Sequence, residues 1–324
     1  MPVMVFILLT IVFLILRVLP GNPVEVILGP KATPEIKEAL MKQWGLDKPW
    51  YIQYIDFISR MLRGDFGLSY YWKLPINTLI WPRFFATVEL AILSMIVAII
   101  LGLTLGSLGA LKRNTILDHV SRFFGVAAYA IPVFWLGLIL QLVFGVYLHL
   151  FPTSGRISTI IEYRIKTITG LYLIDTLLQG DIEAFLDVLS HMALPSLALG
   201  FIISGVINRM TRQNLSEVLQ QDFIVAAKAR GLPEKLIFFR YALKNALIPI
   251  ITIAGMQFAL LMAGAVLTES TFSYPGLGTF LMESIYYRDY NAIQAAVVVY
   301  AIVVVIVNTI VDIIYAYIDP RIRY

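Results

Sequence analysis

Residues 221–249 read QDFIVAAKARGLPEKLIFFRYALKNALIP. Asp222 can begin a helix, the alanines that follow favour one, and Gly231 is placed as its C-terminal cap. Pro233 suits the first turn of a second helix, and Glu234 then lies near the positive N-terminal end of that helix. The stretch therefore predicts a short helix–turn–helix, whose small residues would let another protein approach the backbone closely. An ordinary amphipathic connector is the simpler interpretation of the same pattern.

The chain around this stretch has the composition of a membrane protein. It has 324 residues, of which 59% are hydrophobic and only 14% are charged, and its mean hydropathy is +0.80. Soluble domains are nearer ~45–50% apolar and ~25% charged, so one water-soluble core could not hide all these apolar side chains. The composition argues against a cytosolic enzyme, a disordered linker and a nucleic-acid module. The absence of cysteine rules out a disulfide framework, a thiol nucleophile and a Cys-ligated metal.

Six apolar stretches can each form a helix that crosses a membrane, which needs about 20 mostly apolar residues. The expected fold is an all-α bundle of six transmembrane helices. The stretches comprise residues 2–19, 84–111, 123–151, 192–207, 247–267 and 292–318. The first lacks a basic leader and a cleavage site, so we interpret it as a retained helix and not as a secretory signal. The chain then divides into a first transmembrane helix (1–19), an external segment (20–83) and a five-helix core (84–324) that includes the 208–246 loop.

The distribution of basic residues orients these helices. Lys and Arg gather in the 112–122 loop, in the 208–246 loop and in the tail after Asp319, whereas the 152–191 and 268–291 connections carry more acidic than basic residues. Short basic loops remain on the cytoplasmic side of a membrane. We therefore expect a multi-pass protein of the cell membrane with both termini in the cytoplasm. The net charge of +4 then reflects topology and not a nucleic-acid partner.

The segment 226–231, Ala-Ala-x-x-x-Gly, resembles the EAA loop of the permease subunits of binding-protein-dependent ABC importers. Val225 stands where the glutamate of that name is expected, and Pro233 falls later than in the sugar-permease form. The Arg-Gly-Leu-Pro form is similar to the dipeptide/oligopeptide/nickel branch, as are further motifs along the whole chain. These are Arg17-Val-Leu-Pro-Gly21-Asn-Pro23, Trp44-Gly-Leu-Asp47-Lys-Pro49, Arg63-Gly-Asp65-Phe-Gly67, Leu150-Phe-Pro152-Thr-Ser-Gly155, Thr268-Glu269-Ser-Thr-Phe272-Ser-Tyr-Pro275-Gly276-Leu-Gly278 and Asp319-Pro320-Arg321. The long first external segment resembles that of the B-type member of the permease pair.

The resemblance implies the type I (MetI-like) permease fold, in which the 208–246 loop forms coupling helices that dock on an ATPase subunit. The coupling residues that it implies are Asp222, Ala226, Ala227, Arg230, Gly231, Leu232 and Pro233. The implied partners are a homologous C-type permease, two ATPase subunits, an external solute-binding protein and membrane lipid. ATP and Mg would be bound by the ATPases, so this chain would hold no cofactor and catalyse no reaction. The implied cargo is di- or oligopeptides, with oligosaccharides and nickel chelates as alternatives.

Polar residues inside apolar stretches are costly and indicate functional positions. Gln257 is our candidate for a side chain that lines the pathway. Asn308 and Asp312 are four residues apart and share one helix face, where an interhelical hydrogen-bond clamp is the simpler interpretation. Glu89 is either a charge at the external mouth or the partner of Arg83, and the sequence does not choose between them.

Two other classes of function stay open at this point. A secondary transporter or channel predicts internal inverted repeats and a midplane ion site, and the sequence shows no convincing repeat. A membrane scaffold without transport needs only the helix bundle. The chain has no G-x-x-x-x-G-K-[ST] motif and so lacks the usual phosphate loop for ATP. Its three histidines, His119, His149 and His191, have no metal-ligand spacing.

Overall fold

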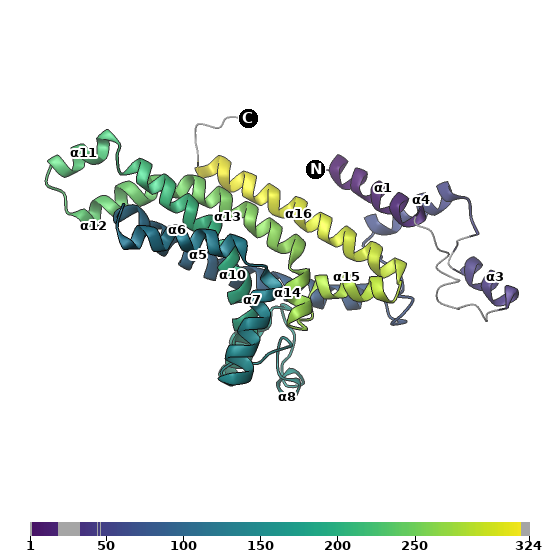
Figure 1. Ribbon diagram of the computed structural model, residues 1–324. Coiled ribbons are helices and arrows are strands. Elements are labelled where there is room, and N and C mark those ends of the chain that lie inside the picture. Colours follow the sequence, from purple (N-terminus) through teal and green to yellow (C-terminus); the bar gives the residue numbers. More distant parts are fainter. Residues whose placement is uncertain (1, 19–32, 44, 46, 319–324) are drawn as a thin grey trace.

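The computed structural model describes residues 2–18, 33–43, 45 and 47–318, and these residues are mostly helical (Figure 1). Among them the backbone forms no strand beyond an isolated bridge between Leu68 and Pro75, so the all-α prediction is confirmed. The first helices are α1 (Pro2–Val18), α3 (Pro34–Gln43), α4 (Trp50–Leu62), α5 (Ile76–Leu111), α6 (Ile116–Ala130), α7 (Val133–Leu140) and the π-helix η1 (Gln141–Tyr147). They are followed by α8 (Thr159–Glu162), α9 (Tyr172–Leu178), α10 (Ile182–Val218), α11 (Asp222–Ala229), α12 (Glu234–Leu236), the π-helix η2 (Ile237–Leu243), α13 (Lys244–Gly264), α14 (Val266–Thr271), α15 (Leu277–Tyr286) and α16 (Tyr290–Ile318).

The six predicted apolar stretches lie mainly on helices. Four helices in the described residues are long and apolar enough to cross a membrane: α5, α10, α16 and the continuous run from α12 through α13. The bent pair formed by α6 and α7–η1 becomes a fifth span if it is counted as one. The helix α1 has 17 residues, about 25 Å at the usual helical rise, which is somewhat less than the ~30 Å hydrocarbon layer.

The helix α5 begins earlier than the sequence predicts. It starts at Ile76 and not at residue 84, so its first two turns belong to the segment that we expected to be external. Pro75 occupies the position just before the helix, and Pro82 is accommodated inside it. Proline is well suited to helix starts and costs one backbone hydrogen bond further in.

The helix α10 is also longer than predicted, with 37 residues in place of 192–207. It begins at Ile182, ten residues before the predicted apolar stretch. Asp181 caps its start by accepting a hydrogen bond from the Ala184 N–H at 3.0 Å. Polar residues in its second half, such as Asn208 and Thr211, are buried against neighbouring helices, and they lower the hydropathy by which membrane helices are predicted.

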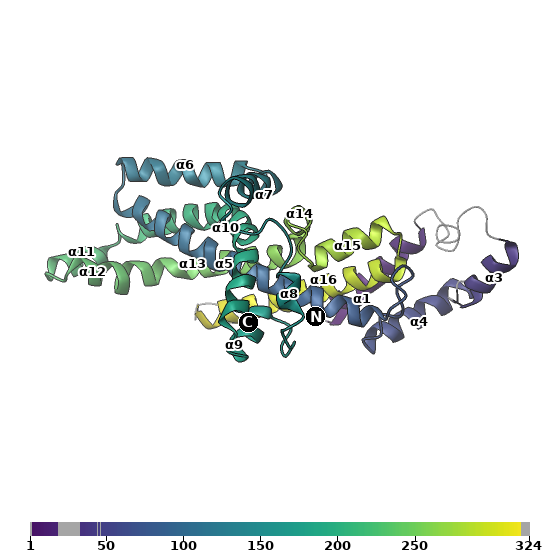
Figure 2. The ribbon, with the colours of Figure 1, turned by 90° about the horizontal axis from the view of Figure 1, so that it is seen from below.

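The third apolar stretch is not one straight helix, and that prediction is wrong. The α6 and α7–η1 helices meet at an angle of 103°. The break lies at Ile131, whose φ of −82° and ψ of 125° are extended, because a following proline disfavours the helical conformation. Figure 2 shows α6 and α7 meeting at this corner.

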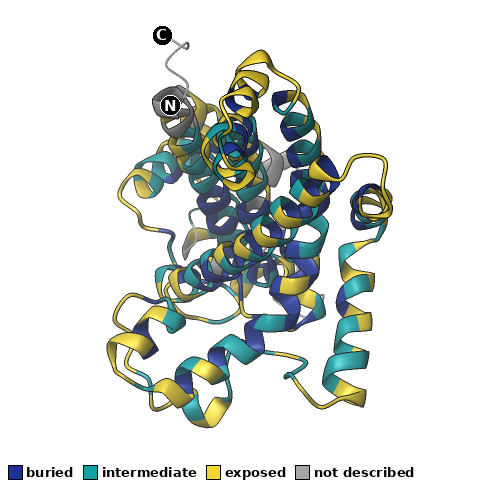
Figure 3. Ribbon diagram, turned by 90° about the vertical axis from the view of Figure 1, so that its left-hand side faces the viewer, coloured by how far each residue is buried: buried dark blue, intermediate teal, exposed yellow. Residues whose placement is uncertain are grey.

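The helices α5 and α10 form the centre of the bundle and pack along each other. Small residues permit this approach, since a Cβ atom on Gly106 would lie 2.7 Å from the Thr211 Cβ. The helix α6 packs on both, α13 packs between α10 and α16, and α1 and α15 pack on α16. Figure 3 shows buried residues where the helices meet and exposed residues on the outward faces.

Candidate functional site

The 221–249 stretch folds as the helix–turn–helix that its sequence predicts. The short helix α11 is followed by a turn and then by one continuous helix made of α12, η2 and α13. Figure 1 shows α11 and α12 at one end of the bundle. The helix begins at Asp222, as predicted, and Gln221 just before it provides no side-chain cap. Asp222 lies in the first turn, where a carboxylate favours the positive end of the helix.

Gly231 ends α11 in the left-handed conformation, with φ +73°. Its N–H donates to the Lys228 carbonyl at 2.9 Å, and the Leu232 N–H donates to the Ala227 carbonyl at 3.3 Å. This pair of bonds is the Schellman motif, which favours glycine because a Cβ atom is strained there. The predicted cap is confirmed. A Cβ atom on Gly231 would meet no atom within 4 Å, so the backbone here is open to another molecule.

A small apolar cluster holds this coupling turn (residues 222–233) against the bundle. Ile224 and Ala227 pack with Leu215 of α10 and Ala110 of α5. Ala227 is therefore buried and supports the turn from inside, whereas our prediction grouped it with the docking residues. The other predicted residues that face outward are Asp222, Ala226, Arg230, Gly231 and Pro233, with Leu232 half-buried.

Exposed apolar side chains lie beside these residues, and sequence reasoning missed them. Phe223 and Val225 of α11 are 38% and 58% exposed, and Phe239 of η2 is 64% exposed. Their signal in the sequence was an apolar residue on the polar side of a short helix. Large apolar side chains on an exposed surface are typical of a site that binds another protein.

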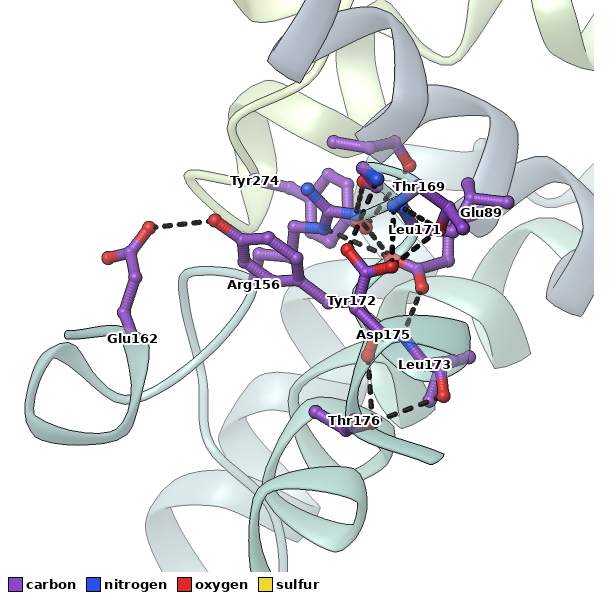
Figure 4. A network of polar contacts seen from close by, with 12 residues as sticks. Glu89, Arg156, Glu162, Thr169, Leu171, Tyr172, Leu173, Asp175, Thr176 and Tyr274 are labelled. Atoms are coloured by element: carbon purple, nitrogen blue, oxygen red, sulfur yellow. Dashed lines mark hydrogen bonds and ion pairs between the residues drawn. The ribbon is translucent and has the colours of Figure 1, made fainter. Parts of the chain in front are cut away.

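A second polar site centres on Glu89 of α5 and the loop before α9 (Figure 4). The Arg156 guanidinium donates to Glu89 Oε2 through Nη2 at 2.6 Å and through Nε at 3.0 Å. It also donates to the Gly170 carbonyl at 2.9 Å, and its Cζ lies 3.8 Å from the centre of the Tyr172 ring. Glu89 Oε1 accepts from the Leu173 N–H at 2.6 Å. The pair thus fastens the 156–173 loop to α5.

This pairing shows that both interpretations of Glu89 from the sequence, a charge at an external mouth and the partner of Arg83, are wrong. Glu89 and Arg156 are only 4% and 5% exposed, so Glu89 is not a free charge at an external mouth. Arg83 pairs instead with Glu283 of α15 at 3.6 Å. Arg156 follows directly on the Gly155 of a motif quoted above, but its partner lies 67 positions earlier in the chain, and that separation hides the pair in the sequence.

Asp175 organises the same loop. Its carboxylate accepts hydrogen bonds from the backbone N–H groups of Ile168, Thr169 and Gly170 and from the Thr169 hydroxyl, at 2.6–3.2 Å. Burial raises the pKa of the Asp175 carboxyl, but these bonds outweigh it and leave the pKa below its ordinary value.

Asp175 makes the stability of the loop depend on pH. Since its pKa is lower in the folded protein, the carboxylate stabilises the fold above the ordinary value of 3.8, and this stability is lost as the pH falls through the folded pKa. We expect Asp175→Asn to lower the free energy of unfolding by about 1–3 kcal/mol at neutral pH and by less in acid. Thermal unfolding of the purified protein at neutral pH and near pH 3 measures this. An equal difference at both pH values would contradict it.

Glu269 explains the motif at residues 268–278. Its carboxylate is fully buried and accepts from the Thr87 hydroxyl at 2.7 Å and from the Thr279 N–H at 3.0 Å. Burial raises the pKa of the Glu269 carboxyl above its ordinary value, and the hydrogen bonds oppose this. Gly276 leaves room for the carboxylate, which a Cβ atom there would strike. Glu269 therefore ties α14 and the start of α15 to α5.

The predicted pathway or clamp residues are not brought together by any contact in the described part of the chain. Gln257 is half-buried on α13, and Asn308 is exposed on α16. The side chain of Asp312 lies outside the described residues. A nearby cavity of about 310 Å³ between α5, α13 and α16 is apolar and is not lined by Gln257. Among the described residues no three His, Asp or Glu side chains lie close enough to hold a metal ion.

Comparisons with known proteins fit this arrangement. The family model described as binding-protein-dependent transport system inner membrane component matches residues 98–324, and the model of the N-terminal part of such components matches residues 1–91. The dipeptide transport system permease protein DppB of Alkalihalophilus pseudofirmus is 41% identical over 97% of this chain and 94% of its own length. DppB of Escherichia coli K12 is 39% identical over 96% of this chain and 93% of its own length. The glutathione transport system permease protein GsiC of Escherichia coli O1:K1 is 36% identical over 98% and 94%, respectively.

A solved structure agrees on the fold. An inward-facing conformation of the MetNI methionine ABC transporter matches with a TM-score of 0.53 over 75% of this chain and 97% of that chain, at 18% identity. Identity this low shows the fold alone, and it is the predicted type I fold. The family match replaces the secondary transporter, channel and scaffold alternatives. The chain thus belongs to the inner membrane components of binding-protein-dependent transport systems, as a multi-pass, non-catalytic permease subunit of an ABC importer.

Proposed function

We propose that this chain is the B-type permease of an importer for di- or oligopeptides. It forms the pathway together with a homologous, non-identical C-type permease. A solute-binding protein delivers the cargo from outside, and two ATPase subunits bind ATP and Mg at the cytoplasmic face. The similarity to dipeptide permeases over nearly the full length carries the proposal, because it includes both the coupling turn and the external motifs.

In this proposal the coupling turn converts the movement of the ATPases into a movement of the membrane helices. The turn lies between α10 and the α12–α13 helix, so a displacement of the turn by the ATPase moves two membrane spans at once. The π-helix η2 lies between the turn and α13, and π-helical segments are frequent at functional sites. ATP binding and release then bias two packings of the bundle, one open to each side.

The orientation follows from the same end of the molecule. Ala110, next to the basic 112–122 loop, packs against Ile224 and Ala227 of the turn. The two basic loops therefore lie on one side, which is the cytoplasmic side by the positive-inside rule. Both termini are cytoplasmic in this proposal, although residues 1 and 319–324 lie outside the described part.

The test combines purification with uptake. We expect the tagged chain, extracted from its native membrane, to bring with it a second permease and the ATPases. Deletion of its gene should abolish uptake of labelled dipeptides. Loss of nickel or oligosaccharide uptake, with dipeptide uptake intact, would reassign the cargo. Recovery of the chain alone or as a homo-oligomer would contradict the assembly.

Charge reversal at Arg230 should weaken the docking of the ATPase. Arg230 is exposed directly beside the Gly231 turn. A surface of the ATPase that binds this positive side chain would repel a negative one in its place. We expect Arg230→Glu to reduce ATPase recovery about tenfold, equivalent to about 1.4 kcal/mol. Lys166→Glu makes the same change of charge at an exposed external position and should have no effect. Unchanged recovery in Arg230→Glu would remove Arg230 from the docking surface.

A further inference from the structure

A cavity of about 920 Å³ lies between α6 and α10 and is not used by the function proposed above. The arginines that line it are Arg113, Arg122, Arg209 and Arg212. Glu217 also lines the cavity, and the Asp118 carboxylate pairs with Arg122 and Arg212. Four positive and two negative groups leave positive charge in excess, so the cavity suits an anion.

Two of the arginines are fixed in place by one buried carboxylate. Asp118 is 0% exposed, and it accepts a hydrogen bond of 2.5 Å from Arg122 and another of 2.5 Å from Arg212. Beside them the Ser121 hydroxyl donates to Asn208 Oδ1 at 2.8 Å. Guanidinium groups match the oxygens of a phosphate, and a pair held in advance loses little freedom when it binds one.

The ends of the apolar stretches indicate that the arginines lie at the depth of lipid headgroups. The apolar part of α10 ends at Ile207, directly before Arg209 and Arg212, and Arg113 follows the end of α5. These are the points where both helices leave the hydrocarbon layer on the side of the coupling turn. Basic pockets between membrane helices at this level are suited to anionic headgroups.

The other end of the cavity is apolar and faces the hydrocarbon layer. Val126 and Tyr129 line it one to two turns further along α6, away from the coupling turn. They are 68% and 73% exposed, and the Arg209 guanidinium lies 5.8 Å from the centre of the Tyr129 ring. Figure 2 shows α6 at the edge of the bundle. Charge at the membrane surface and an apolar wall beneath it match the two parts of a phospholipid.

We propose that this cavity binds the anionic headgroup of a phospholipid from the cytoplasmic leaflet, whose acyl chain lies along α6. The leaflet follows from the orientation proposed above. The cavity suits an anionic lipid better than a peptide, because its arginines outnumber its carboxylates, whereas the charges of the two ends of a peptide cancel. Free phosphate would use the arginines but leave the apolar wall without a contact.

Lipid retention by the purified complex tests the site. We expect native mass spectrometry to show that added phosphatidylglycerol is retained in preference to phosphatidylcholine. Arg113→Gln/Arg209→Gln, which leaves the Asp118 bonds intact, should weaken this retention roughly 30-fold. The control Lys112→Gln/Arg240→Gln removes two exposed charges from the same side but outside the cavity and should retain lipid normally. Equal retention of the two lipids, or an equal loss in the control, would overturn the proposal.

A cross-linking experiment identifies the occupant without changing an arginine. The sequence has no cysteine, so Val126→Cys gives this chain a single attachment point for a photoactivatable probe. We expect lipid adducts in membranes, whereas adducts with the second permease or with a transported peptide would overturn the proposal. Displacement of phosphatidylglycerol by inorganic phosphate at equal concentration would overturn the lipid assignment and indicate a site for a free anion. None of these measurements uses uptake, so the lipid site and the transport function can fail independently.

Discussion

Replacing Gly231 with valine should separate ATP hydrolysis from transport. A β-branched residue in the left-handed conformation costs about 1–2 kcal/mol, and Gly231 has φ +73°. The turn relieves this strain by leaving its present conformation, which breaks the bond from Leu232 to Ala227 and moves the exposed Arg230. We expect ATP hydrolysis to continue in the assembled complex while uptake falls about tenfold or more.

Paired assays of ATPase activity and peptide uptake in the reconstituted complex measure the separation. Gly180→Val is the matched control, because Gly180 has φ +68° and a Cβ atom there would also meet no atom within 4 Å. Valine should therefore be strained there to the same extent as at position 231. Gly180 lies in a turn on the side that we propose to be external, so the substitution should have no effect on coupling. Gly231→Asn should keep part of the uptake, since asparagine tolerates this conformation. Normal substrate-stimulated hydrolysis and uptake in Gly231→Val would count against the coupling turn.

The coupling turn was predictable from sequence because its structure is local. Alanines favour a helix, Gly231 ends it and Pro233 turns the chain, and all these preferences act within a few residues. Apolar stretches likewise gave the positions of the membrane helices. The ends of these helices could not be predicted from hydropathy, because α10 continues through buried polar residues such as Asn208 that reduce its hydropathy.

The contacts of Glu89 and Glu269 could not be predicted because they join distant parts of the chain. Glu89 and Arg156 are 67 positions apart, and Thr87 and Glu269 are 182 positions apart. Composition shows a charge in an apolar stretch, but only tertiary packing shows which charge neutralises it. The corner at Ile131 had a local signal in Pro132, but a proline can also lie inside one continuous helix, as Pro195 does in α10.

Replacing Arg156 with methionine should strongly destabilise the packing of the 156–173 loop on α5. Methionine fills part of the space but leaves the Glu89 carboxylate buried without its counter-charge, which costs about 3–5 kcal/mol. The Gly170 carbonyl also loses its donor. We expect a lower unfolding temperature of the purified protein and faster proteolysis within residues 158–170, with the coupling turn unchanged.

The double variant Glu89→Gln/Arg156→Met separates the loss of the charge pair from the loss of packing. Glutamine carries no charge and can still accept the bond from the Leu173 N–H, so the double variant should be more stable than Arg156→Met alone. Arg164→Met is the control, because Arg164 is 49% exposed in its pairs with Asp181 and Glu183, and such pairs contribute only about 0–1 kcal/mol. If the double variant is no more stable than the single one, the uncompensated carboxylate is not the cause, and the guanidinium would act through its contacts with Gly170 and Tyr172 instead.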